Sequence, residues 1–279
     1  MYKLIYKMKI FLKSFVFLFL FWMSTSLVFA DNVKEGNRLY DSGKYQEALS
    51  YFMKPDAANN PATMNRIGYM YKKGLGIKEN PEEAYKWYRN AAEAGFAAAQ
   101  FNLGLMYQHG KPIPENMNEA IQWFRKAADQ NYPDAEMKMG YLAVTGTGVK
   151  KDYKEAMQWY RRAAEHGDVG AYADIGLFYD KGQGVKKDPN RAVQYYILGA
   201  EKGDSEAQLF LADSYAKANG VPYDANRALY WYSESAKNGN VLAMKVLSGI
   251  YKLGQLGVQK NDAESQRWLD MAEKAEKKQ

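Results

Sequence analysis

The chain has 279 residues, no cysteine, two histidines and a formal charge of +6. The absence of cysteine excludes disulfides, thiolate metal sites and a cysteine nucleophile. Four lysines in the first 30 residues carry most of the excess charge, which leaves 34 of the 38 basic residues against 32 acidic residues in 31–279. A balanced chain lacks the clustered positive charge on which nucleic-acid affinity depends, so we expect no nucleic-acid partner.

The first 30 residues have the pattern of a secretory signal peptide. A basic start is followed by an apolar run from Phe15 to Trp22, and Val28 and Ala30 suit the −3 and −1 positions of a cleavage site. We therefore predict residues 1–30 to be a cleaved signal peptide, with the mature chain beginning at Asp31. The expected location is the periplasm of a Gram-negative bacterium or the outside of the cell.

Two alternatives remain open at this end of the chain. The segment Ser14–Ala30 has 17 residues, the lower limit for crossing a bilayer, so an uncleaved inner-membrane anchor is the rival interpretation. Met8 is a second candidate for the start of translation. No cysteine follows the apolar run, which excludes a bacterial lipoprotein.

Residues 31–60 resemble one short tetratricopeptide-type unit. The residues that carry this resemblance are Gly36, Tyr40, Gly43, Tyr45, Ala48 and Phe52. The unit lacks the Gly-x-Gly loop that follows in the rest of the chain. We expect it to cap the N-terminal end of the repeat array.

From residue 61 onward, small and aromatic residues return every 36 positions. The small series is Gly68, Gly104, Gly140, Gly176, Ala212 and Ser248, and the aromatic series is Trp87, Trp123, Trp159, Tyr195 and Trp231, with Trp268 one residue late. A fixed period in this range is the mark of a solenoid built from one repeated supersecondary unit.

Each unit predicts two helices. The first carries Ala-x-x-x-Leu-Gly-x-x-Tyr, as in Ala99, Leu103, Gly104 and Tyr107, and this spacing places the four residues on one helical stripe. The second carries Ala-x-x-Trp-Tyr-x-x-Ala-Ala. It ends at a Gly or Asn that repeats with the period, at Gly95, Asn131, Gly167, Gly203 and Gly239, as expected for a left-handed residue after a helix.

The link between the two helices also follows a pattern. Glycine pairs such as Gly74 and Gly76 supply left-handed backbone at the end of the first helix. Asn80 or Asp152 then begins the second helix as its N-cap, with an acidic residue in the first turn. The aromatic residues at fixed spacing are best interpreted as core between helices.

These motifs, in this order, resemble the Sel1-like repeat family, a relative of the tetratricopeptide repeat. The resemblance covers six 36-residue units in 61–279, which end in a short charged tail. It implies an all-α fold, a right-handed superhelical α/α solenoid of antiparallel helix pairs with a concave binding face. It also implies an adaptor or scaffold role, and secreted bacterial members are linked to envelope assembly, signalling and host contact.

By analogy with tetratricopeptide geometry, side chains of the first helices that lie off the core stripe are expected to line the concave face. The apolar candidates are Tyr69, Phe101, Leu105, Met137, Tyr141 and Leu177, and polar or further candidates include Lys72, Asp180, Lys181, Leu209, Asp213 and Lys217. Exposed apolar strips tend to mark protein contacts, so we predict a protein or peptide partner here. The alternative is that a tight superhelix buries these side chains.

A catalytic alternative depends on Ser214-Tyr215-Ala216-Lys217, a formal Ser-x-x-Lys match. Cysteine-rich relatives have been described as penicillin-binding or β-lactamase-like, but the companion Ser-Asp-Asn and Lys-Thr-Gly elements of such hydrolases are absent. The two histidines, His109 and His166, lie in different repeats, and a zinc site needs three or four converging ligands. We therefore expect no enzyme activity, catalytic residue, metal or cofactor.

Overall fold

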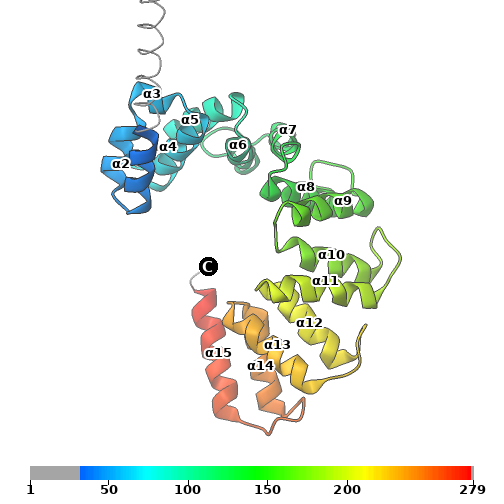
Figure 1. Ribbon diagram of the computed structural model, residues 1–279. Coiled ribbons are helices and arrows are strands. Elements are labelled where there is room, and N and C mark those ends of the chain that lie inside the picture. The colour runs from blue at the N-terminus through cyan, green and yellow to red at the C-terminus, as the bar shows by residue number, and fades with distance from the viewer. Residues whose placement is uncertain (1–31, 278–279) are drawn as a thin grey trace, which may run out of the picture. The chain divides into compact units, whose positions relative to one another are not determined.

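The computed structural model describes residues 32–277, and every regular element in that range is a helix (Figure 1). The predicted signal peptide lies outside these described residues. Across 32–277, no helix combines the length and the apolar character needed to cross a membrane. The chain divides into two compact units, residues 1–126 and 127–279, and each is described by itself.

The first unit contains a helix over residues 32–41 and then α2 (Tyr45–Phe52), α3 (Pro55–Ala58), α4 (Pro61–Lys73), α5 (Pro81–Glu93), α6 (Ala97–His109) and most of α7 (Met117–Ala128). Helices α4 and α5 pack together as one pair, and α5 also contacts α6. The first helices of neighbouring repeats, α4 and α6, touch as well.

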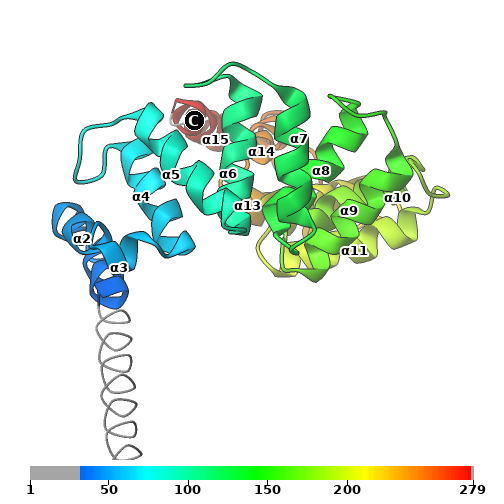
Figure 2. The ribbon, with the colours of Figure 1, turned by 90° about the horizontal axis from the view of Figure 1, so that it is seen from above.

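The second unit continues the same arrangement with α8 (Pro133–Thr145), α9 (Tyr153–Glu165), α10 (Ala171–Lys181), α11 (Pro189–Glu201), α12 (Ser205–Lys217), α13 (Ala225–Lys237), α14 (Val241–Leu253) and α15 (Asp262–Glu276). Each helix contacts the next, and α10 also contacts α12, the first helix of the following repeat. Figures 1 and 2 show the successive helix pairs of this unit. The predicted all-α solenoid of helix pairs is confirmed.

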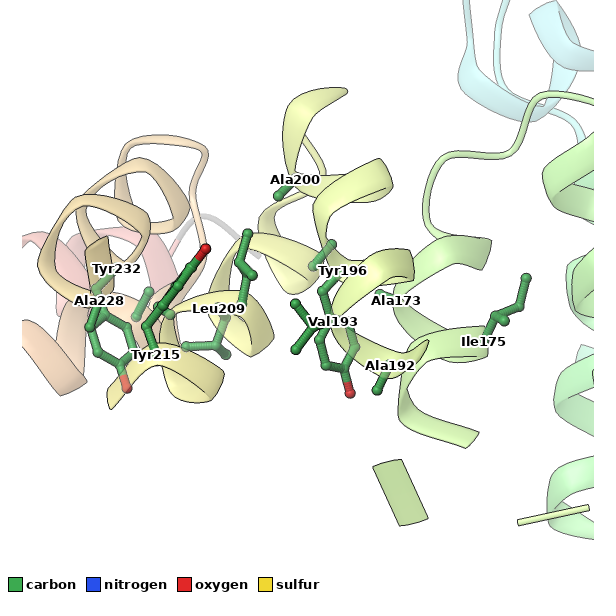
Figure 3. Close-up of a cluster of buried hydrophobic side chains, with 14 of the residues drawn as sticks. Ala173, Ile175, Ala192, Val193, Tyr196, Ala200, Leu209, Tyr215, Ala228 and Tyr232 are labelled. Carbon is green, nitrogen blue, oxygen red and sulfur yellow. The ribbon is translucent and has the colours of Figure 1, made fainter. Parts of the chain in front are cut away.

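The repeated glycine of the first helix exists because an aromatic ring occupies the space of its side chain. A Cβ on Gly104 or Gly140 would lie 2.6 Å from the ring of Phe124 or Tyr160 on the second helix. Gly176 faces Tyr196 in the same way, and Figure 3 shows Tyr196 among the buried side chains of this region. These rings are buried, whereas Trp87 and Trp123 are only partly so. The second aromatic residue of each Trp-Tyr motif therefore forms the centre of the helix pair.

The predicted helix ends are confirmed. The side chains of Asn80 and Asp152 accept hydrogen bonds from Glu83 N and Glu155 N, which caps α5 and α9. All five predicted positions after the second helix have positive φ, including Asn131 at 62°. These caps satisfy backbone groups that a helix leaves unpaired at its ends.

The fifth and sixth repeats depart from the pattern in their loops. Ala218 takes the left-handed position that glycine holds elsewhere, with φ of 54°. In the sixth repeat, where Trp268 comes one residue late, Leu256 in the loop before it also has positive φ, of 54°. Ser248 replaces the packing glycine there, and its hydroxyl lies 3.0 Å from that of Ser265. The period of 36 therefore persists while individual contacts change.

Candidate partner-binding surface

In the first unit, the three predicted binding residues differ in exposure. Tyr69 on α4 is 40% exposed, whereas Phe101 and Leu105 on α6 are half-buried. The Phe101 ring lies 5.6 Å from the ring of Phe124, which is fully buried. Phe101 therefore contributes to packing as well as to the surface.

The second unit repeats this division. Tyr141 on α8 is 53% exposed, Met137 packs against the core cluster of this unit, and Leu177 on α10 is half-buried. The Lys138 ammonium lies over the Tyr141 ring, 5.7 Å from the ring centroid. The structure thus leaves the two tyrosines open and partly covers the other four candidates.

The repeat register explains this difference through two rows on the first helices. One row contains Phe101, Met137 and, a further two repeats on, Leu209, which is 6% exposed. The other row lies four residues later and contains Tyr69, Leu105, Tyr141, Leu177 and Asp213, none of which is buried. Leu209 was expected on the open face, and that expectation is wrong because its row packs into the core cluster.

A hollow of about 260 Å³ lies on the face formed by α10 and α12. Its lining side chains are Leu177, Asp180, Lys181, Tyr196, Phe210, Asp213, Ser214, Lys217 and Asn219. Leu177, Asp180, Lys181, Asp213 and Lys217 were predicted for this face, whereas Tyr196, Phe210 and Asn219 were not. Tyr196 comes from a second helix, Phe210 follows Leu209 of the buried row, and Asn219 lies in the loop after α12.

Polar contacts fix several groups of the hollow. Asn219 Nδ2 donates to Asp180 Oδ1 at 2.7 Å, and Asp213 accepts from the Tyr232 hydroxyl and from Lys217 Nζ, both at 2.5 Å. Burial, together with the charges of Asp180 and Asp213, raises the pKa of the Tyr196 phenol. The floor of the hollow is therefore a neutral phenol beside two carboxylates.

A group of carboxylates lies at the opposite ends of the same two helices. Asp204 caps α12 by accepting from Ala207 N, and Asp168, two residues before the N-cap of α10, accepts from Ala171 N. Burial and the charges of Glu206, Asp168 and Asp204 raise the pKa of Asp174 to about 7. This part of the surface is strongly acidic.

One carboxylate of the second unit has a structural role. Glu136 is fully buried, with Oε1 2.9 Å from Arg162 Nε and Oε2 2.8 Å from His166 Nδ1. In the second and fifth repeats a glutamine takes this position, and Gln100 and Gln208 donate to Ala92 O and Ala200 O of the preceding helix. Glu136 therefore joins neighbouring helices.

Over residues 32–277, no group of three or more His, Cys, Asp or Glu side chains is placed to hold a metal ion.

The Ser-x-x-Lys match does not have the geometry of a catalytic pair. The Ser214 hydroxyl donates to Phe210 O at 2.8 Å, within its own helix. Lys217 forms its contact with Asp213 one turn away. A nucleophile needs a base within hydrogen-bond reach, and neither contact supplies one.

The helix pairs and the repeated glycine–aromatic contact define an α-solenoid repeat protein. The chain matches the Sel1 repeat six times, over residues 61–96, 97–132, 133–168, 169–204, 205–240 and 241–276. It therefore belongs to the Sel1 repeat family, as the sequence motifs predicted. This fold is a type of protein–protein interaction scaffold and is generally not catalytic.

Solved structures show the same fold. A Sel1 repeat protein from Oxalobacter formigenes is 68% identical, with a TM-score of 0.83, over 87% of this chain and 96% of that chain. A protective antigen of uropathogenic Escherichia coli strains is 28% identical, with a TM-score of 0.66, over 88% of this chain and 61% of that chain. An immunity protein from Pseudomonas aeruginosa, 18% identical with a TM-score of 0.52 over 77% and 81%, shares the fold alone. No curated protein matches the chain.

Proposed function

We propose that this chain is a non-enzymatic adaptor of the bacterial cell envelope that binds a partner protein or peptide on the open face of its first helices. The observation that carries this proposal is the exposure of Tyr69 and Tyr141, which occupy the same row in two repeats. Repeat solenoids present extended binding surfaces, and tyrosine is enriched among residues that dominate binding energy. Leu105 and Leu177 continue the row as half-buried apolar residues.

The envelope location depends on the N-terminal sequence pattern. Residues 1–30 are predicted to be removed, which would release a chain that begins at Asp31. A similar protein is a protective antigen of uropathogenic E. coli strains, and a protective antigen is expected to be accessible to the immune system. N-terminal sequencing of the protein from its own cells tests this location. Asp31 as the first residue supports export, whereas an intact start at Met1 or Met8 favours the membrane-anchored alternative.

The binding proposal is tested by cross-linked capture from the cell envelope. The two exposed tyrosines are the residues to change, because Phe101 contacts a buried ring and its substitution would disturb folding. We expect the unaltered protein to capture a partner that a Tyr69→Glu/Tyr141→Glu variant loses. Tyr223→Glu/Tyr230→Glu, at two exposed tyrosines of the fifth repeat outside this row, is the matched control. Equal capture by all three proteins would show that the row containing Tyr69 and Tyr141 does not bind the partner.

The hydrolase alternative is not favoured, because Ser214 and Lys217 bond to other partners. We expect no turnover of a chromogenic β-lactam by the purified protein. Turnover that disappears in Ser214→Ala would reverse this conclusion.

A further inference from the structure

The α10–α12 face carries two parallel rows with the same order of side chains. On α10 the order is Asp174, Leu177 and Asp180, and on α12 it is Glu206, Phe210 and Asp213. Adjacent members of each row are three or four residues apart, so they are neighbours on the surface of their helix. Because α10 and α12 touch, the two rows form a surface that is acidic at both ends and apolar in the middle.

Several of these carboxylates lack the counter-charges found elsewhere in the chain. On the second helices, Asp188, Asp224 and Glu234 each have a basic partner three residues away, at 2.7–3.4 Å. By contrast, Asp174, Asp180 and Glu206 have no basic group within 4.0 Å among residues 32–277. The lysines of the hollow do not change this, since Lys217 is paired with Asp213 and Lys181 is exposed.

An unpartnered hydroxyl lies in the hollow between the rows. Tyr196 is 2% exposed and lines the hollow, and its ring packs 5.3 Å from that of Phe210. Within the described part of the chain its hydroxyl makes no hydrogen bond. The equivalent Tyr232 hydroxyl bonds to Asp213, whereas the Tyr196 hydroxyl opens into the hollow and is accessible to a ligand. This free hydroxyl beside Asp180 can accept a hydrogen bond from a cationic ligand group that the carboxylate attracts.

We propose that the α10–α12 face binds a segment of the partner that carries two Arg or Lys residues separated by two residues, one of them apolar. One cation enters the hollow beside Tyr196 and Asp180, the other meets Asp174 and Glu206, and the apolar residue covers Leu177 and Phe210. This inference rests on the proposed adaptor function and identifies the chemistry of its partner. An anionic ligand would face Asp180 in the hollow and Asp174 and Glu206 at the other end, none of which has a basic partner within the described residues.

The spacing of the carboxylates selects the form of the segment. Asp174 and Asp180 are six residues apart on a helix, which corresponds to about 9 Å along its axis at ~1.5 Å per residue. A polyproline-II segment has three residues per turn and rises ~3.1 Å per residue, so its residues i and i+3 share a face about 9 Å apart. Extended segments of the type Arg-Pro-Leu-Arg match this distance.

The test is fluorescence anisotropy with a labelled peptide that contains Arg-Pro-Leu-Arg between glycine and serine residues. The matched peptide has citrulline in place of both arginines, which keeps the shape and removes the charge. We expect the purified protein to bind the arginine peptide at least about tenfold more tightly, with an affinity that falls as salt is added, since exposed charge interactions are screened. Equal binding of the two peptides, or no binding of either, would overturn the proposal.

Two variants locate the site. Asp180→Asn/Glu206→Gln should weaken arginine-peptide binding roughly tenfold, in line with the loss of charge-assisted hydrogen bonds. Asp262→Asn/Glu273→Gln on α15 removes the same charge and should leave binding within about twofold. Equal losses in both would show a general charge effect and overturn the proposal.

A third variant protects the test against misfolding. If Asp180→Asn/Glu206→Gln loses its helical circular dichroism, the site is tested with Tyr196→Phe instead. This variant removes only the hydroxyl, so it should fold normally and bind the arginine peptide severalfold more weakly. Unchanged binding by Tyr196→Phe would then refute the site. The adaptor function fails separately, if envelope capture does not depend on Tyr69 and Tyr141. This inference alone fails if Asp180→Asn/Glu206→Gln still captures the partner normally.

Discussion

Replacing the packing glycine of the third repeat by alanine tests the contact on which every repeat is built. The new Cβ of Gly140→Ala would lie 2.6 and 2.8 Å from Cε1 and Cδ1 of Tyr160, about 1 Å closer than ordinary contact, and the ring is buried. Overpacking of this kind costs roughly 3 kcal/mol. Better helix propensity returns about 1 kcal/mol. We therefore expect the free energy of unfolding to fall by about 2 kcal/mol.

The chain supplies a matched control on α14. Gly249 is also helical, but a Cβ there would meet no atom within 4 Å. Gly249→Ala should therefore gain the helix-propensity term alone and raise stability by up to about 1 kcal/mol. Urea unfolding followed by circular dichroism measures both variants. Similar shifts for the two, or a more stable Gly140→Ala, would refute the glycine–ring argument.

Three further predictions concern single positions of the second unit. Asp174→Asn should stabilise the protein by about 2 kcal/mol at pH 8 and make its urea midpoint nearly independent of pH between pH 5 and 8. The pKa of Asp174 is about 7 in the folded protein against an ordinary 3.8, so its ionisation costs stability above pH 7 and protonation removes that cost as the pH falls. A midpoint of the unaltered protein that rises with pH would contradict this. Ala218→Gly should raise the thermal midpoint by relieving φ of 54°, worth about 1 kcal/mol, and a lower midpoint would argue against strain. Glu136→Ala should lower the free energy of unfolding in urea by about 3 kcal/mol, because Arg162 loses its carboxylate partner. Glu136→Gln should cost about 1 kcal/mol, because glutamine fills this position in the second and fifth repeats. Equal costs would refute the ion-pair account.

The repeat architecture could be predicted because its determinants are local and recur. Asn80 and Gly95 mark the ends of a helix by their own conformational preferences, and the period places them in register with five other units. Gly140 belongs to the small series that the period of 36 identifies, but the sequence pattern does not identify the residue it packs against. The structure shows that this partner is Tyr160, one residue after the tryptophan that the period makes conspicuous.

The binding surface could be predicted only in part, because burial on the first helices depends on neighbouring repeats. Leu209 and Tyr141 are both off the core stripe in sequence, yet one is buried and the other exposed. The hollow of α10 and α12 depends on Tyr196 from a second helix. Its free hydroxyl follows from the position of atoms in three dimensions, and no spacing in the sequence indicates it.

The central claim is that a protein partner binds the open face of the first helices. Hydrogen–deuterium exchange of the protein, alone and with the captured partner, tests it most directly. The account predicts slower exchange in α8, α10 and α12, with little change in α9 and α13, because the first helices carry the proposed contacts apart from Tyr196 on α11. Protection confined to the second helices or to the loops between them would contradict it.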